Sequence, residues 1–144
     1  MAKNYSLDSP KLKILMFNFL CFYNSIENIR TETELDAQYP LIKLKVFSIL
    51  KQSNLSLLRV EQIKAFDKDL IGSNSFIFTG KSKIVSLLRH LRNSIAHNNI
   101  ALNPNDNKTI IVKDYKKEKG VIEPTCYGHI TFAKFKELLN ITNL

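Results

Sequence analysis

The sequence predicts a mainly α-helical fold, a bundle of about four to five helices with a small β-hairpin before the last helix. Apolar residues recur at three- and four-residue spacing over several stretches, which is typical of helices that bury one face. Two short β-branched runs flank a charged tip near the C-terminus, which indicates one strand pair. With 144 residues, 44% of them hydrophobic, residues 1–144 are expected to form a single domain around one core.

Three helices are expected in the first half of the chain. Ser9 supplies an N-cap and Pro10 a first helical residue, and apolar side chains continue at helical spacing over residues 10–26. After an acidic segment, a second helix is expected over residues 40–52. The residues of this helix that are expected in the core are Leu41, Leu44, Val46 and Ile49. A third, shorter helix is predicted over residues 57–69.

The second half of the chain is expected to contain one long helix, the hairpin and a last helix. The long helix follows Gly80 and covers about residues 81–98. Pro104 and the Asn and Asp residues around it favour a turn, which ends the regular structure there. The hairpin comes next, over residues 109–122, and Thr131 is expected to cap the last helix.

The helix over residues 81–98 carries side chains that a core does not need. Its apolar residues share one face, and they are Ile84, Leu87, Leu88, Leu91 and Ile95. At about 100° per residue, Arg92, Asn93 and His97 lie away from that face. Because Asn93 and His97 are one turn apart, the amide is expected to hydrogen-bond and orient the imidazole.

The same three residues have chemical properties that suit a phosphate. The guanidinium of Arg92 is a permanently charged planar donor that matches a phosphate group. An imidazole gives and takes protons near neutral pH, so His97 is a candidate acid or base. The sequence therefore predicts a site for phosphate chemistry on this helix.

The segment Arg92-Asn93-Ser94-Ile95-Ala96-His97 resembles the motif of the HEPN superfamily, an Arg followed by a polar residue, three further residues and a His. The resemblance extends over most of the chain, whose size and layout are similar to those of small, often plasmid-borne members. It implies a HEPN-like helical domain and a homodimer whose two motifs form a metal-independent endoribonuclease site of toxin or defence type. Arg92, Asn93 and His97 would be the catalytic residues, and the products would be a 2′,3′-cyclic phosphate and a 5′-hydroxyl.

Other residues are candidates for supporting roles. Arg89 and His90 precede the motif on the same helix, and the alternative for His90 is a solvated surface histidine. Members that act as toxins beside a nucleotidyltransferase antitoxin commonly carry a Tyr two residues after the motif His. This chain has Asn99 there, which argues against that mode of regulation, although an antitoxin protein stays a candidate partner.

The charge of the chain favours RNA as its partner. The net charge is +8, from 21 Lys and Arg against 13 Asp and Glu. The hairpin tip carries a basic group that could hold an RNA backbone and stack a base. It consists of Tyr115, Lys116, Lys117 and Lys119, and the alternative for this group is an ordinary solvated turn.

No cofactor and no metal are expected. Cys21, Cys126 and His129 lack the spacing of metal ligands, and the chain has neither a Gly-rich phosphate loop nor a Ser/His/Asp set. The apolar run over residues 14–23 is shorter than the roughly 20 residues that span a membrane, and no basic signal segment precedes it. A cytoplasmic location away from the membrane is expected.

Two further classes of function stay open at this point. A HEPN-like dimer could bind RNA, a nucleotide or a partner protein through the same cleft without cleaving anything, since Arg and His bind phosphates as readily as they cleave them. A structural helical domain would carry the motif by chance.

Overall fold

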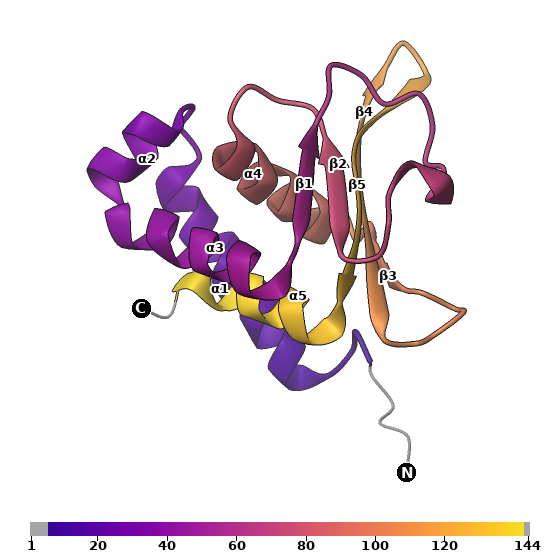
Figure 1. The fold of residues 1–144 in the computed structure, drawn as a ribbon, viewed down its shortest axis with the longest axis horizontal. Helices are drawn as coiled ribbons and strands as arrows, with labels where there is room; N and C mark the ends of the chain where they lie inside the picture. The colour runs from indigo at the N-terminus through magenta and orange to yellow at the C-terminus, as the bar shows by residue number, and fades with distance from the viewer. Residues whose placement is uncertain (1–5, 143–144) are drawn as a thin grey trace.

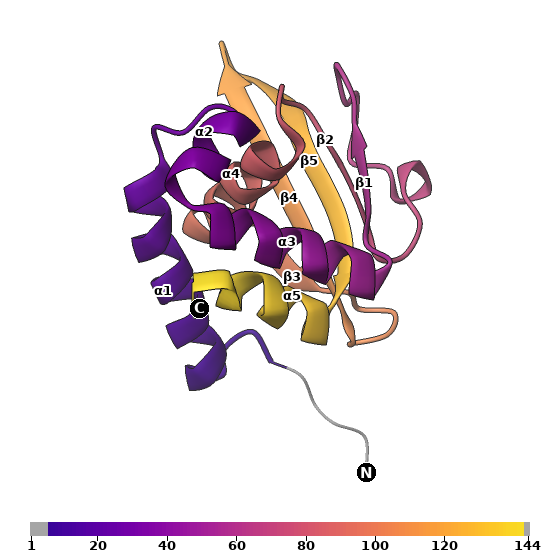
Figure 2. The same ribbon diagram turned by 60° about the vertical axis from the view of Figure 1, so that its left-hand side comes forward.

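The computed structural model describes residues 6–142 and shows five α-helices on one face of a five-stranded sheet (Figure 1; Figure 2). The α-helices are α1 (Pro10–Ile26), α2 (Glu32–Gln38), α3 (Pro40–Ser53), α4 (Lys83–Ala96) and α5 (Phe132–Leu139). The strands are β1 (Ser56–Arg59), β2 (Ser75–Phe78), β3 (Ile100–Leu102), β4 (Thr109–Glu118) and β5 (Val121–Thr131). Short 3-10 helices cover Lys68–Leu70 and Asn140–Thr142. This α/β architecture shows that the expectation of a mainly α-helical bundle is wrong.

The sheet has the strand order β1-β2-β5-β4-β3. The first two strands are parallel, and every other neighbouring pair is antiparallel. The expected hairpin exists as β4 and β5, but its strands are long and form the centre of the sheet. Its tip is Lys119 and Gly120, whose positive φ angles of 51° and 78° are those of a tight two-residue hairpin turn.

The predicted helix over residues 57–69 is the clearest local error. Residues 56–59 form β1, which pairs in parallel with β2 from Ser56 opposite Ser75 to Arg59 opposite Phe78. Only Lys68–Leu70 is helical in the rest of that segment. Strand formation here depends on a partner that lies further along the chain, so the local spacing of apolar residues does not determine it.

Several helices lie where the sequence predicted them. Ser9 caps α1 by accepting a hydrogen bond from the N–H of Leu12 at 3.2 Å, and Thr131 caps α5 in the same way. The helix predicted over residues 40–52 is α3, but its buried face is rotated from the expected one. Leu41 and Leu44 are exposed, whereas the buried side chains are Ile42, Val46 and Ile49.

The acidic segment before α3 forms a helix, α2, that was not expected from the sequence. Thr31 caps α2 by accepting from the N–H of Glu34 at 3.1 Å, and the carboxylate of Glu34 accepts from the N–H of Arg30 at 3.4 Å. Glu32 reaches further and accepts from the N–H of Ile84 at 2.8 Å. The short helix α2 therefore also satisfies a free donor at the start of α4.

Both faces of the sheet are covered. The main core lies between the helices and the sheet and includes Phe19, Phe76 and Phe135, which have no exposed surface. On the opposite face, the segment between β1 and β2 covers a smaller cluster of Ile63, Ile77 and Tyr127. Within residues 6–142, no helix is both long and apolar enough to cross a membrane.

Candidate functional site

The site residues are positioned by α4, which is buried on two sides. The expected apolar face packs into the core through Ile84, Leu87, Leu88 and Leu91. A second side lies against β4 and carries His90 and Ser94, which are at most 3% exposed and hydrogen-bond to residues of that strand. His90 is therefore not a solvated surface histidine.

Both ring nitrogens of His90 form hydrogen bonds to oxygen atoms of the protein. Nδ1 lies 2.8 Å from Oδ2 of Asp114, and Nε2 lies 2.7 Å from the carbonyl oxygen of Thr79. A carbonyl and a carboxylate can only accept, so the ring donates to both when it carries a proton on each nitrogen. With both nitrogens occupied, His90 holds the site together and is not free to take a proton from a substrate.

Asp114 is the centre of this network and was not among the site residues expected from the sequence. Its Oδ2 also accepts from the amide of Asn93 at 3.1 Å, and its Oδ1 accepts from the N–H of Tyr115 at 2.9 Å. Asn93 accepts in turn from Nη1 of Arg92 at 3.1 Å. A continuous hydrogen-bonded chain thus runs from Arg92 through Asn93 and Asp114 to His90.

The sequence did contain a signal for Asp114. It follows Ile110 and Val112 at every second residue, on the buried face of β4, where a lone carboxylate requires a partner. A shift in the register of β4 and β5 lies between Asp114 and Tyr115. Bulges of this kind change the direction of the side chains that follow.

His97 lies at the end of α4 as its C-cap, with its side chain exposed. Asn98 follows in the left-handed conformation with φ 57°, and the N–H of Asn99 donates to the carbonyl of Ser94 at 2.7 Å. This pattern ends the helix in a Schellman motif and fixes the backbone at His97. In the described part of the chain the imidazole has no hydrogen-bond partner, because Asn93 bonds Asp114 and Arg92 instead of orienting His97 as expected.

A cavity of about 320 Å³ opens beside the network. It brings together five of the residues singled out in the sequence, which are Arg89, His90, Asn93, Tyr115 and Lys116. Arg92 is connected to this cavity through Asn93 but does not line it, and neither does His97. Lys117 and Lys119 lie further out on the exposed end of the hairpin.

Charge pairing leaves one cation of the cavity without an anion. Asp114 pairs with His90, Glu123 lies 3.7 Å from Lys116, and Glu61 lies 3.5 Å from Arg59. Arg89 forms no hydrogen bond or ion pair within residues 6–142. A guanidinium in this position can receive a phosphate group.

The arginines of α4 also act on a buried phenol of α1. Burial raises the pKa of Tyr23, and the positive charges of Arg89, Arg30 and Arg92 oppose that rise. Arg89, Arg30 and Arg92 therefore all lie close enough to this phenol to act on its charge.

The comparison with known families agrees with this picture. Residues 11–142 match the family described as HEPN pEK499 p136. The chain belongs to this HEPN family. The match confirms the resemblance drawn from the motif helix, and it covers the sheet as well as the helices. No match was found among curated proteins or solved structures.

Membership in a HEPN family suggests a nuclease or RNA-related function in general. The described residues of this HEPN chain contain no cluster of three His, Cys, Asp or Glu side chains that could hold a metal ion. His129 lies on β5, where its Nε2 is 3.1 Å from the hydroxyl of Tyr127. Burial lowers the pKa of His129 and raises that of the Cys126 thiol.

Proposed function

We propose that this HEPN protein is a metal-independent endoribonuclease of toxin or defence type that acts as a homodimer. The observation that carries the proposal is the hydrogen-bonded chain from Arg92 to His90 beside a cavity with an unpaired arginine. The hydrogen-bonded chain holds the guanidinium of Arg92, the proposed phosphate-binding group, in place before any substrate binds. Preorganised donors of this kind stabilise charge that develops during a reaction.

The reaction uses a nucleophile that RNA itself supplies. The 2′-hydroxyl oxygen attacks the adjacent phosphorus, the bond to the 5′ oxygen breaks, and that oxygen takes up a proton. A 2′,3′-cyclic phosphate and a 5′-hydroxyl result. His97 serves as the base for the 2′-hydroxyl or as the acid for the leaving oxygen, a role worth about 10²- to 10⁴-fold in rate.

The arginines hold the phosphate during this step. Arg92 is oriented by Asn93, which Asp114 holds in turn, so the guanidinium has a defined direction. Arg89 adds a second positive charge from inside the cavity. Together they balance the negative charge that grows on the phosphate oxygens in the transition state.

A homodimer would complete the site. One imidazole does not act easily as base and acid on opposite sides of a single phosphorus, and two subunits related by a twofold axis provide two. The exposed position of His97 at the end of α4 is compatible with such a shared site. RNA is the proposed substrate, and an antitoxin protein is a further proposed partner.

Cleavage of an RNA pool by purified variants tests this function. His97→Ala and Arg92→Ala should each abolish cleavage without unfolding the protein, because both side chains lie outside the core. Asn93→Ala should lose less cleavage activity than these two variants, because Asn93 only orients Arg92 and transfers no proton. His129→Ala and Arg30→Ala are matched controls outside the site and should cleave as the unaltered protein does.

The substrate and the buffer test the mechanism separately. RNA with 2′-deoxy sugars should stay intact because the nucleophile is missing, and cleavage should persist in excess EDTA because the proposed groups act without a metal. Activity that survives the loss of His97 would show that the assignment of the proton carrier is wrong.

A second candidate is a non-catalytic HEPN dimer that binds RNA, a nucleotide or a partner protein. It is favoured by the position of the two histidines, since both nitrogens of His90 are engaged within the fold and His97 does not line the cavity. A purified dimer that binds RNA but leaves a panel of substrates uncut would establish this candidate in place of the nuclease.

A further inference from the structure

A second cavity, a groove of about 680 Å³, lies between α3, β1 and the start of α4. Its lining includes five cationic side chains, which are Lys43, Lys51, Arg59, Lys81 and Lys83. Glu32 is the one carboxylate among the lining residues, and it is bonded to the N–H of Ile84 at 2.8 Å. The groove therefore has a large excess of positive charge, which favours a ligand with several negative charges.

The groove also contains an aromatic ring that the fold does not bury. Phe47 on α3 is 51% exposed, and the ammonium of Lys43 lies 5.9 Å from the centre of its ring. Apolar side chains, including Leu50 and Leu57, also line the groove. Cations along a groove with an exposed aromatic ring are typical of sites for single-stranded nucleic acid, where phosphates meet the cations and a base stacks on the ring.

The two lysines at the start of α4 oppose the helix dipole, and the anion that the fold places at this end is the carboxylate of Glu32 from α2. Lys81 and Lys83 flank the N-cap Ser82, and the first turn of α4 has no acidic residue. The N-terminal end of a helix carries partial positive charge, so cations there lower its stability. A bound phosphate would turn this unfavourable arrangement into an attractive one.

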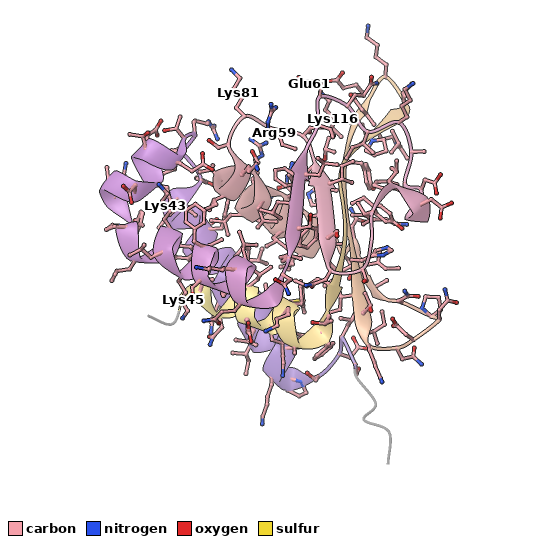
Figure 3. The ribbon with its side chains drawn as sticks, in the orientation of Figure 1. Lys43, Lys45, Arg59, Glu61, Lys81 and Lys116 are labelled. Atoms are coloured by element: carbon pink, nitrogen blue, oxygen red, sulfur yellow. The ribbon has the colours of Figure 1, made fainter. Side chains whose placement is uncertain are left out.

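The groove lies next to the candidate site. Thr79 lines the site cavity and Lys81 lines the groove, so the two are separated by one short segment of backbone. Arg59 donates to the carbonyl of Gly80 at 3.2 Å and pairs with Glu61, which lines the site cavity. Figure 3 shows the side chains of Arg59, Lys81, Glu61 and Lys116 at this end of the molecule.

We propose that the groove between α3, β1 and α4 binds the continuation of a single-stranded RNA whose reactive phosphate lies in the candidate site. The position of the cut rests on the proposed function, whereas the binding of RNA in the groove does not require cleavage. Phosphates contact Lys81, Lys83 and Arg59, and a base stacks on Phe47.

Binding of labelled oligouridylates to the full chain tests this, measured by fluorescence anisotropy in 2′-deoxy form so that nothing is cut. The unaltered protein should bind a strand of about 10 nucleotides much more tightly than one of about 3. Phe47→Ala and the double variant Lys81→Ala/Lys83→Ala should each weaken binding of the long strand by roughly fivefold or more, with little effect on the short one. Phe47→Tyr should retain tight binding because its ring still stacks.

The double variant Lys11→Ala/Lys13→Ala is the matched control, because it removes the same charge from exposed positions on α1. Equal weakening by the two double variants would overturn the proposal, since net charge alone would then explain binding. Competition by polyglutamate or by anionic lipid vesicles as effective as that by RNA, with no effect of Phe47→Ala, would overturn it in favour of an acidic protein or a lipid surface.

Thermal unfolding provides a readout that does not depend on RNA. Lys83→Ala should raise the melting temperature of the free protein, because it removes a cation from the helix N-terminus. A lower melting temperature would show that Lys83 has a structural role and would contradict the argument. A protein that binds long strands through the groove but cleaves no RNA would support this inference while rejecting the nuclease.

Discussion

At the scale of single residues, Asp114 determines the arrangement of the candidate site more than any motif residue does. It is 4% exposed and accepts hydrogen bonds from three groups, on His90, Asn93 and the backbone of Tyr115. Arg92 depends on it indirectly, because the amide of Asn93 joins the two. The direction of the Arg92 guanidinium is thus set by a carboxylate on a different element.

Substitution of Asp114 by Asn should destabilise the protein and disorder the site. Both oxygens of the carboxylate accept, so an amide in the same place must point its NH₂ group at a donor. We expect the free energy of unfolding in urea to fall by about 1–3 kcal/mol, the usual cost of a buried unsatisfied polar group.

Asp36→Asn is the control, because Asp36 is exposed on α2 and should change stability little. If both variants unfold at the same urea concentration as the unaltered protein, the network around Asp114 contributes nothing to stability. A loss of stability in Asp114→Asn but not in Asp36→Asn would confirm the place of Asp114 at the centre of the network.

The sequence predicted part of this residue-scale picture. Helical spacing correctly put Arg92, Asn93 and His97 outside the apolar face of one helix, because that face follows from the 3.6-residue period alone. It did not predict that Asn93 bonds Asp114 instead of His97, since that contact depends on how β4 packs against α4. Local spacing carries no information about such a partner.

At the scale of elements, the helices were more predictable than the strands. Caps such as Ser9 and Thr131 and the spacing of apolar residues act within one segment, so α1 and α5 begin where expected. A similar local signal was present for α2 in Thr31 and Glu34, which have the residue types and the spacing of a capping box. Short strands such as β1 and β2 are defined by each other across the chain and lack such a signal.

One residue of β5 shows how closely the elements pack. A Cβ atom at Gly128 would lie 1.6 Å from the ring of Phe76 on the neighbouring strand. Gly128→Ala should therefore displace this fully buried ring and destabilise the protein by about 1–3 kcal/mol or more in urea unfolding.

Gly72→Ala is the matched control, since a Cβ atom there meets nothing closer than 3.9 Å. A Gly128→Ala/Phe76→Leu double variant should lose less free energy of unfolding than the sum of the two single variants' losses, because the smaller leucine side chain relieves the contact. Strict additivity would show that the two residues do not press against each other.

At the scale of the whole molecule, the fold places two different cavities on either side of residues 79–81. One is the polar cavity around the motif helix, and the other is the basic groove with Phe47. The net charge of +8 is consistent with both acting on a polyanion. The sheet, which the sequence did not predict, makes this possible, because β1, β4 and β5 each supply residues to one of the two cavities.

The last prediction concerns assembly through the end of α4. If two copies of His97 meet across a twofold axis, the exposed Ala96 beside it lies in the contact, and Ala96→Arg should block the approach by its size and charge. Light scattering at micromolar concentration should then give twice the chain mass of 16.6 kDa for the unaltered protein and the single mass for Ala96→Arg. Ala133→Arg adds the same side chain at an exposed position on α5 and should stay dimeric.

RNA cleavage should disappear with the dimer in Ala96→Arg and persist in Ala133→Arg, because the proposed reaction needs an imidazole from each subunit. A monomeric Ala96→Arg protein that still cleaves would show that one chain contains the whole site, and an unaltered protein that is monomeric at every concentration would rule out the shared site altogether.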